Sequence, residues 1–355
     1  MSLICGTATT GQGMRFVVLF LTAVAGVAVF LVGLARLVDP RDDFGTGVFP
    51  VVVSDARREK LEQFVTYNRE RPVEGIVLGS SRSMKLGPQS LEAVFGLRFF
   101  NLSVDSARAE DYLALHRWVR RQGALIRVVI VGLDVEAFHD DDAPDSTLES
   151  NATLRTALEG RPLRGNERLI QAVRRYKSVF TTSYVADMAR SVGVRLSRIP
   201  SEARASVFEA DGYLRYPRWE GQRVAGTFDL EREIEECLPK YLRRFQGMTH
   251  LSARRRQALE TLIAEAETDG ARVIVWLTSI HPRTARYLEE RTHYGDLLVE
   301  TREYLEELHR RFGVGVHDYS EPTAYGGAPT GWYDCGHIDE TNAARVATSL
   351  ARDAS

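Results

Sequence analysis

Cysteine and net charge are both scarce in this chain. It has 3 cysteines among 355 residues, and none lies in a paired C-x-x-C spacing, so neither a zinc-binding pattern nor a disulfide framework is indicated. Its 46 basic and 48 acidic residues leave a formal net charge of -2, which gives no overall field to attract nucleic acid. The sequence also contains no internal repeat or low-complexity tract. We therefore expect a globular protein that does not bind nucleic acid.

An uncharged apolar run lies near the N-terminus. Residues 16–34 contain no charged side chain, and Arg15 and Arg36 flank them. A helix needs roughly 20 apolar residues to cross the hydrocarbon core of a membrane. The alternative is a cleaved signal peptide, for which residues 23–25 resemble a cleavage site, but the apolar core of a signal peptide runs only about 7–15 residues. We predict an uncleaved, single-pass anchor at 16–38, with the remaining chain outside the cytoplasm.

The rest of the chain alternates short β-rich apolar runs with helical stretches, which is the pattern of a parallel sheet covered by helices. Strands that are buried on both faces are almost continuously apolar, as four of these runs are. The predicted strands lie at residues 75–78, 97–102, 127–133, 272–277 and 314–319. The predicted fold class is α/β, a three-layer α/β/α sandwich with a flavodoxin-like parallel sheet.

The predicted domain organisation has four parts. A short tail at 1–15 precedes the anchor, and a polar linker at 39–50 leads to one domain at 51–355. That domain contains an insertion at about 140–270, which we place beside the carboxyl edge of the sheet, where open α/β sheets bind ligands. The aromatic stretch at 213–219 is interpreted either as a sugar-stacking surface or as the ordinary core of the insertion.

A serine follows the first predicted strand, in the sequence Gly79-Ser80-Ser81. A serine on a sharp strand-to-helix turn is exposed at the edge of the sheet, and the helix N-terminus beside it offers N–H groups to a developing oxyanion. Small residues are also common in ordinary turns, so this signal is weak when taken alone.

A second signal, Asp334 and His337, precedes the last predicted helix. A carboxylate three residues before a histidine can hold the imidazole Nδ1 and leave Nε2 facing a nucleophile, as in an acyl-transfer triad. One alternative is a metal site that also uses Cys335, but a second cluster of ligands is missing. The other alternative is a solvated loop without chemistry.

Together these residues resemble the SGNH/GDSL hydrolase superfamily over about residues 70–353. Its first block, usually Gly-Asp-Ser, matches the sequence that ends at Ser81, and its fifth block, Asp-x-x-His, matches Asp334 and His337. The resemblance implies that these three residues are catalytic and that the mechanism requires no metal or organic cofactor. The Gly-Ser-Ser opening looks like bacterial membrane-anchored members similar to teichoic-acid D-alanylation and alginate O-acetylation proteins, which implies a substrate among acylated envelope polymers.

Two blocks of the superfamily pattern differ in this chain. The second block normally supplies a glycine N–H to the oxyanion hole, and Ser106 lies nearest that place. The third normally ends in an asparagine whose amide donates to the oxyanion, whereas this chain has Asp134, which can only accept when ionised. Either another donor such as Asn101 or Arg82 substitutes, or catalysis is weak, or Asp134 binds a structural partner. The candidate oxyanion donors are Ser81, Ser106 and Asn101, and the candidate lining residues are Arg82, Asp134 and His281.

The sequence thus predicts an O-acyl esterase or O-acyltransferase acting on an acylated envelope polysaccharide or a similar ester, with a membrane acyltransferase as a candidate partner. The alternative is a non-catalytic envelope scaffold that binds a polymer or an acyltransferase, which Asp134 favours. Outside the cytoplasm, Cys237 and Cys335 are able to pair, although spacing alone does not decide whether they do.

Overall fold

The computed structural model describes residues 9–41, 43–53, 55–141, 146–162, 164–197 and 207–352. The chain divides into two compact units, which we describe separately. One unit comprises Met1–Ser54 and Gly165–Ala203, and the other comprises Asp55–Arg164 and Arg204–Ser355. The candidate site lies entirely in the second unit.

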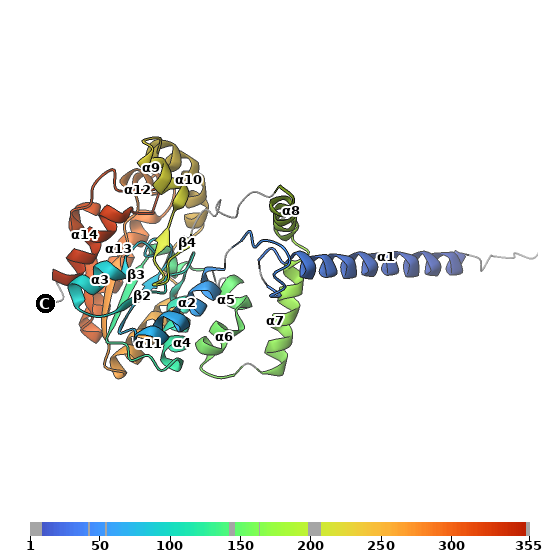
Figure 1. Ribbon diagram of the computed structural model, residues 1–355, viewed down its shortest axis with the longest axis horizontal. Coiled ribbons are helices and arrows are strands. Elements are labelled where there is room, and N and C mark those ends of the chain that lie inside the picture. The colour runs from blue at the N-terminus through green and yellow to red at the C-terminus, as the bar shows by residue number, and fades with distance from the viewer. Residues whose placement is uncertain are drawn as a thin grey trace, which may run out of the picture. The chain divides into compact units, whose positions relative to one another are not determined.

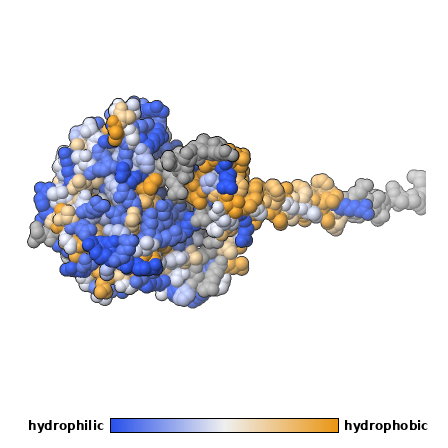
Figure 2. Space-filling view, in the orientation of Figure 1, coloured by the Kyte–Doolittle hydropathy of each residue, from blue (hydrophilic) through white to orange (hydrophobic). Residues whose placement is uncertain are grey.

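The first unit is built around the N-terminal helix α1 (Thr9–Val38). Its Gly13–Val38 segment is long and apolar enough to cross a membrane, as predicted, and Figure 2 shows hydrophobic residues along the visible face of this helix. Two further helices belong to the same unit, α7 (Gly165–Ser178) and α8 (Thr182–Ser197). Their side chains enclose the end of α1 in a small buried cluster, formed by Ala35, Val38, Val179, Tyr184 and Met188. Part of the predicted insertion therefore forms its core with the apolar helix.

The second unit contains a five-stranded sheet in which every strand is parallel to its neighbours. The strands are β1 (Gly75–Gly79), β2 (Phe99–Asn101), β3 (Val128–Leu133), β6 (Arg272–Leu277) and β7 (Gly315–Asp318). Their order across the sheet is β2-β1-β3-β6-β7. Each strand coincides with one of the five apolar runs of the sequence, so the predicted α/β class and parallel sheet are confirmed.

Helices cover both faces of this sheet (Figure 1). Successive side chains of a strand point to opposite faces, so Val77 packs in one buried cluster while Ile76 and Leu78 pack in another. The helices on the Val77 side are α3 (Pro88–Phe95) and α14 (Glu340–Arg352). Those on the other side are α2 (Ala56–Glu70), α4 (Ala109–Arg121), α11 (Ala253–Thr268) and α13 (Tyr294–Phe312).

Most of the remaining elements lie between β3 and β6 in the sequence. They are η1 (Val135–Phe138), α5 (Ser146–Ser150), α6 (Ala152–Glu159), β4 (Val207–Phe208), β5 (Leu214–Arg215), α9 (Pro217–Val224) and α10 (Leu230–Phe245). Strands β4 and β5 pair as a short antiparallel hairpin, which the sequence did not predict because each has only 2 residues. After β6 come α12 (Pro282–Glu289) and, beyond β7, η3 (Pro322–Tyr325).

The strand order reverses between β1 and β3. The chain moves outward from β1 to β2 on one side and then returns to β3 on the other. The loops after two such strands diverge and leave a crevice at the carboxyl edge, which is where open α/β sheets bind ligands. Ser81 lies two residues after β1 and Asp134 directly after β3, so the topology places both at this crevice.

Candidate active site

The turn after β1 holds Ser81 at the carboxyl edge of the sheet. The N–H of Arg82 donates to the Ser80 hydroxyl at 3.1 Å, and the N–H of Ser83 donates to the Ser80 carbonyl at 3.0 Å. The turn packs tightly because β3 has a glycine beside it, Gly132, where a Cβ atom would overlap the Ser83 hydroxyl. These contacts fix the backbone on both sides of Ser81, whose side chain stays half-buried.

Ser81, His337 and Asp334 form one continuous chain of hydrogen bonds. The Ser81 Oγ lies 2.8 Å from His337 Nε2, and His337 Nδ1 lies 2.8 Å from each carboxylate oxygen of Asp334. The N–H groups of Gly336 and His337 also donate to Asp334 Oδ1, at 2.9 and 3.0 Å, and fold the loop back on itself. The structure therefore brings the three predicted residues together, in the arrangement that a nucleophile, a base and an orienting carboxylate would require.

The environment of Asp334 keeps its carboxyl group ionised. Burial alone would raise the pKa of Asp334, but the adjacent His337 and the two backbone N–H donors outweigh burial and lower it below its ordinary value. An ionised carboxylate at this place selects the imidazole tautomer with the proton on Nδ1, and it stabilises the imidazolium that forms when Nε2 takes a proton.

A disulfide bond joins Cys335 of the histidine loop to Cys237 of α10, with a Cα–Cα distance of 6.1 Å. The pairing that spacing left undecided is therefore present in the structure. Gly336 follows immediately, and a Cβ atom there would overlap the hydroxyl group of Tyr241, also on α10. The loop that carries Asp334 and His337 is thus fixed against α10 by a covalent bond and by close packing.

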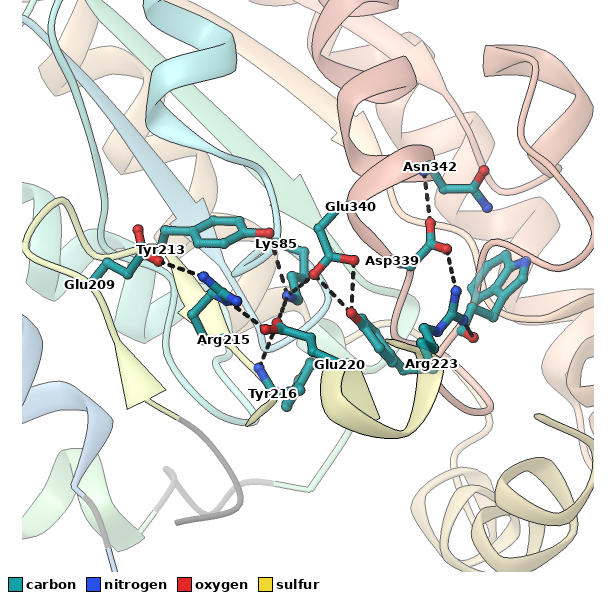
Figure 3. Close-up of polar contacts among 12 residues, drawn as sticks. Lys85, Glu209, Tyr213, Arg215, Tyr216, Glu220, Arg223, Asp339, Glu340 and Asn342 are labelled. Atoms are coloured by element: carbon teal, nitrogen blue, oxygen red, sulfur yellow. Dashed lines mark hydrogen bonds and ion pairs between the residues drawn. The ribbon is translucent and has the colours of Figure 1, made fainter. Parts of the chain in front are cut away.

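A buried lysine joins the serine turn to the histidine loop (Figure 3). Lys85 Nζ is 2.7 Å from a carboxylate oxygen of Glu220 on α9 and 2.6 Å from one of Glu340, the first residue of α14. The Tyr333 hydroxyl donates to Glu340, with oxygen–oxygen distances of 2.7 and 2.8 Å. The Lys85 side chain is 1% exposed, so its ammonium group is shielded from solvent.

The aromatic stretch after β5 packs against the loop that carries Asp334 and His337. Trp219 stacks on Tyr333 with a centroid distance of 5.4 Å, and Tyr216 meets the His337 ring edge-on at 6.0 Å. Arg223 pairs with Asp339 at 2.8 Å, as Figure 3 shows. Of the two interpretations of this stretch, packing is the one that these contacts favour.

A cleft of about 370 Å³ opens beside the serine, and both Ser81 and Ser106 line it. Within the described part of the chain, neither backbone N–H of these two serines has a hydrogen-bond acceptor. Ser106 has a positive φ of 50°, a left-handed conformation that costs a non-glycine residue energy. The two free N–H groups are suited to bind an oxyanion. The positive φ of Ser106 means that the backbone is strained at one of these two residues.

Asp134 lines the same cleft, but its carboxylate group is bound by two side chains that do not line the cleft. The Thr278 hydroxyl donates to it, and Arg82 Nη1 lies 3.6 Å from it. Arg82 is buried and also pairs with Glu136. Burial would lower the pKa of Arg82, but the two carboxylates raise it well above its ordinary value, so the arginine stays charged. Of the three alternatives for Asp134, the structure shows the one in which its carboxylate binds structural partners, Thr278 and Arg82. Arg82 itself does not line the cleft.

Two of the candidate residues have other roles. Asn101 is fully buried, its amide group donates to the carbonyls of Ser83 and Leu86, and its amide oxygen accepts from the N–H of Ser103. The prediction that Asn101 is an oxyanion donor is therefore wrong, because every hydrogen of that amide is already used to hold the serine turn. His281 accepts from the N–H of Arg283 as the cap of α12, and it does not line the cleft.

Four charged residues that line the cleft were not predicted from the sequence. These residues are Arg108, Glu136, Arg243 and Arg244. No local motif marks them, because their place in the cleft depends on how η1, α10 and the start of α4 pack. Among the described residues, no three His, Cys, Asp or Glu side chains converge as the ligands of a metal ion would.

The fold and the site together define an α/β protein with a Ser-His-Asp relay at a topological switch point. Comparison of the chain with protein-family models and with curated proteins finds no match. Its function is therefore argued from the geometry of this site.

Proposed function

We propose that this protein is a membrane-anchored O-acyl esterase or O-acyltransferase of the SGNH type. The observation that carries the proposal is the relay in which Ser81 Oγ lies 2.8 Å from His337 Nε2 while Asp334 holds the opposite nitrogen. A second argument is the strand order, which is that of flavodoxin-like sheets, with the serine at the end of the first strand and Asp-x-x-His before the last helix.

The reaction begins when Ser81 Oγ attacks the carbonyl carbon of an ester. The serine proton passes to His337 Nε2, and the N–H groups of Ser81 and Ser106 bind the oxyanion of the tetrahedral intermediate. Collapse of that intermediate breaks the bond to the alcohol, which leaves with the proton from His337. The resulting acyl-serine is then cleaved by water or by a hydroxyl group of an acceptor, activated by the same histidine.

The substrate that we propose for this protein is an ester on an envelope polysaccharide. Helix α1 confines the site near a membrane, where acyl donors and nascent polymers reach a high local concentration. We place the second unit outside the cytoplasm, and the Cys237–Cys335 bond supports this placement because disulfides persist in oxidising compartments. A reporter fused after Ser355 should be active only on that side, and activity in the cytoplasm would contradict the placement.

Acyl turnover tests the proposal. Full-length protein in uncharged detergent is supplied with p-nitrophenyl acetate, with and without a polysaccharide acceptor, and both nitrophenol release and acylated polymer are measured. Ser81→Ala should abolish both products, whereas Ser90→Ala, which removes an exposed hydroxyl on α3, should leave them unchanged. Acceptor-dependent acylation indicates a transferase, and release that no acceptor changes indicates an esterase. Equal turnover by wild type and Ser81→Ala would contradict the proposal.

A non-catalytic scaffold is the second candidate function. It is favoured by one observation, that Asp134 is anchored to Arg82 at the place where the superfamily has an amide donor. Because loss of one oxyanion donor costs about 10²–10³ in rate in known enzymes, a protein that relies on two backbone N–H groups is expected to be slow. No turnover by a folded wild-type protein would favour the scaffold.

A further inference from the structure

Helix α10 ends at the cleft with two adjacent arginines, Arg243 and Arg244, and both line it together with Ser81. The helix is firmly placed, because its Cys237 is bonded to Cys335 and its Tyr241 packs against Gly336. The guanidinium groups therefore extend from an element that is itself fixed to the catalytic loop.

These two arginines are the least neutralised charges of the cleft. In the described part of the chain Arg243 has no carboxylate within ion-pair distance, and the one carboxylate partner of Arg244, Glu136, is 3.9 Å away and already pairs with Arg82. The third arginine of the cleft, Arg108, pairs with Asp141.

The acidic residues around the cleft do not cancel this charge. Asp134 and Glu136 face the buried Arg82, and Asp141 also pairs with the buried Arg255 at 2.9 Å. Burial raises the pKa of Asp105, which precedes Ser106, against the opposing positive charges of His337, Arg57, Lys60 and Arg244. Positive charge at the end of α10 is therefore the least balanced charge that lines the cleft, because the nearest carboxylate partner printed for either arginine there is 3.9 Å from Arg244.

We propose that the cleft binds an acyl substrate that carries carboxylate or phosphate groups near its ester, and that Arg243 and Arg244 recognise those groups. This inference rests on the proposed function and specifies its substrate class. A guanidinium group is a planar fork of donors that matches the two oxygens of a carboxylate or phosphate. The cleft, at about 370 Å³, lies within the usual range of about 300–1,000 Å³ for small-ligand sites.

The test measures binding without turnover. Full-length protein carrying Ser81→Ala, in uncharged detergent, is titrated calorimetrically with hexagalacturonate, with a six-unit polyphosphate, and with neutral maltohexaose. The same titrations are made after adding Arg243→Gln, Arg244→Gln or both. Arg232→Gln is the matched control, because Arg232 is exposed in the first turn of α10 and forms an i,i+4 pair with Glu236 on the same helix.

Charged oligomers should bind more tightly than maltohexaose. Each arginine substitution should weaken that binding about fivefold, and both together about 25-fold, from the Coulomb energy of about 1 kcal/mol for each contact near 4 Å in water. Salt at about 0.5 M should remove most of the preference because it screens exposed charges. Arg232→Gln should bind as the Ser81→Ala parent does. Tighter binding of hexagalacturonate identifies carboxylates as the recognised groups, and tighter binding of polyphosphate identifies phosphates.

Equal binding of the charged and neutral oligomers would overturn the inference, and so would anion binding that the double substitution leaves unchanged. Failure of the proposed function gives a different result, since wild type would then bind the charged oligomer but turn over no ester. A wild type that turns over p-nitrophenyl acetate while Ser81→Ala binds no anion would overturn the inference alone.

Discussion

Replacing Glu340 with glutamine should destabilise the protein at neutral pH and have almost no effect in strong acid. Glu340 accepts hydrogen bonds from Lys85 and Tyr333. Its partial burial would raise its pKa, but these two donors and the charge of Lys85 lower that pKa from 4.5 to about 2. Such a shift corresponds to about 3.4 kcal/mol of stability at neutral pH. Because 48% of the Glu340 side chain is exposed, solvent screening reduces the expected value to about 1–2 kcal/mol.

The direction of the pH dependence follows from the lowered pKa. The contribution of Glu340 is fully present above pH 4.5, the ordinary pKa of a glutamate in the unfolded chain, and is lost as the pH falls towards the folded value of about 2. Glutamine resembles the protonated acid in shape and charge. The difference in unfolding free energy between wild type and Glu340→Gln should therefore be about 1–2 kcal/mol at pH 7 and should vanish near pH 2.

The assay is urea unfolding of the full-length protein in uncharged detergent, followed by tryptophan fluorescence between pH 7 and pH 2. Glu306→Gln is the control, because Glu306 is 74% exposed and forms only an i,i+4 pair with Arg310 on α13. It should cost less than about 0.5 kcal/mol at every pH. A difference for Glu340→Gln that stays constant with pH, or that is absent at pH 7, would refute the assigned role of the Lys85 pair.

Three further substitutions probe the site. Asp334→Asn should lower kcat for ester turnover about 10⁴-fold, as loss of the orienting carboxylate does in serine proteases, and an unchanged kcat would exclude that role. Ser106→Gly should raise the unfolding free energy by up to about 1 kcal/mol, because glycine adopts the positive φ of 50° without strain; a destabilised variant would contradict the strain. Replacing Cys237 and Cys335 by alanine should cost about 2–4 kcal/mol in urea unfolding, since their bond closes a long loop. No loss would mean that the bond does not constrain the unfolded chain.

The parts of the fold that the sequence predicts are those with a local signal. Each strand of the sheet is a short apolar run, and α1 is an uncharged run of membrane-spanning length. The serine turn and the histidine loop were found for the same reason. Ser81 lies two residues after a strand, and Asp334 and His337 are three residues apart. Only the contact between Ser81 and His337 joins residues that are distant in the sequence.

The parts that could not be predicted depend on distant residues. Lys85 joins carboxylates from α9 and α14, and the Cys237–Cys335 bond spans a sequence separation of 98. Asn101 was misassigned because its position at the end of the second strand suggested the site, whereas its partners, the carbonyls of the serine turn, are set by tertiary packing. A pattern in the sequence shows which group is available, but not which neighbour uses it.

Covalent labelling tests the central claim most directly. A fluorophosphonate reacts with a serine only where a neighbouring base removes its proton, and the 2.8 Å contact of Ser81 with His337 supplies that base. Full-length wild-type protein in uncharged detergent should therefore acquire one adduct, which mass spectrometry of its peptides should locate on Ser81. Ser81→Ala should remove the adduct and His337→Ala should slow its formation strongly, while Ser90→Ala should label as wild type does. A folded wild-type protein that acquires no adduct, or an adduct that persists in Ser81→Ala, would contradict the claim that Ser81 is an activated nucleophile.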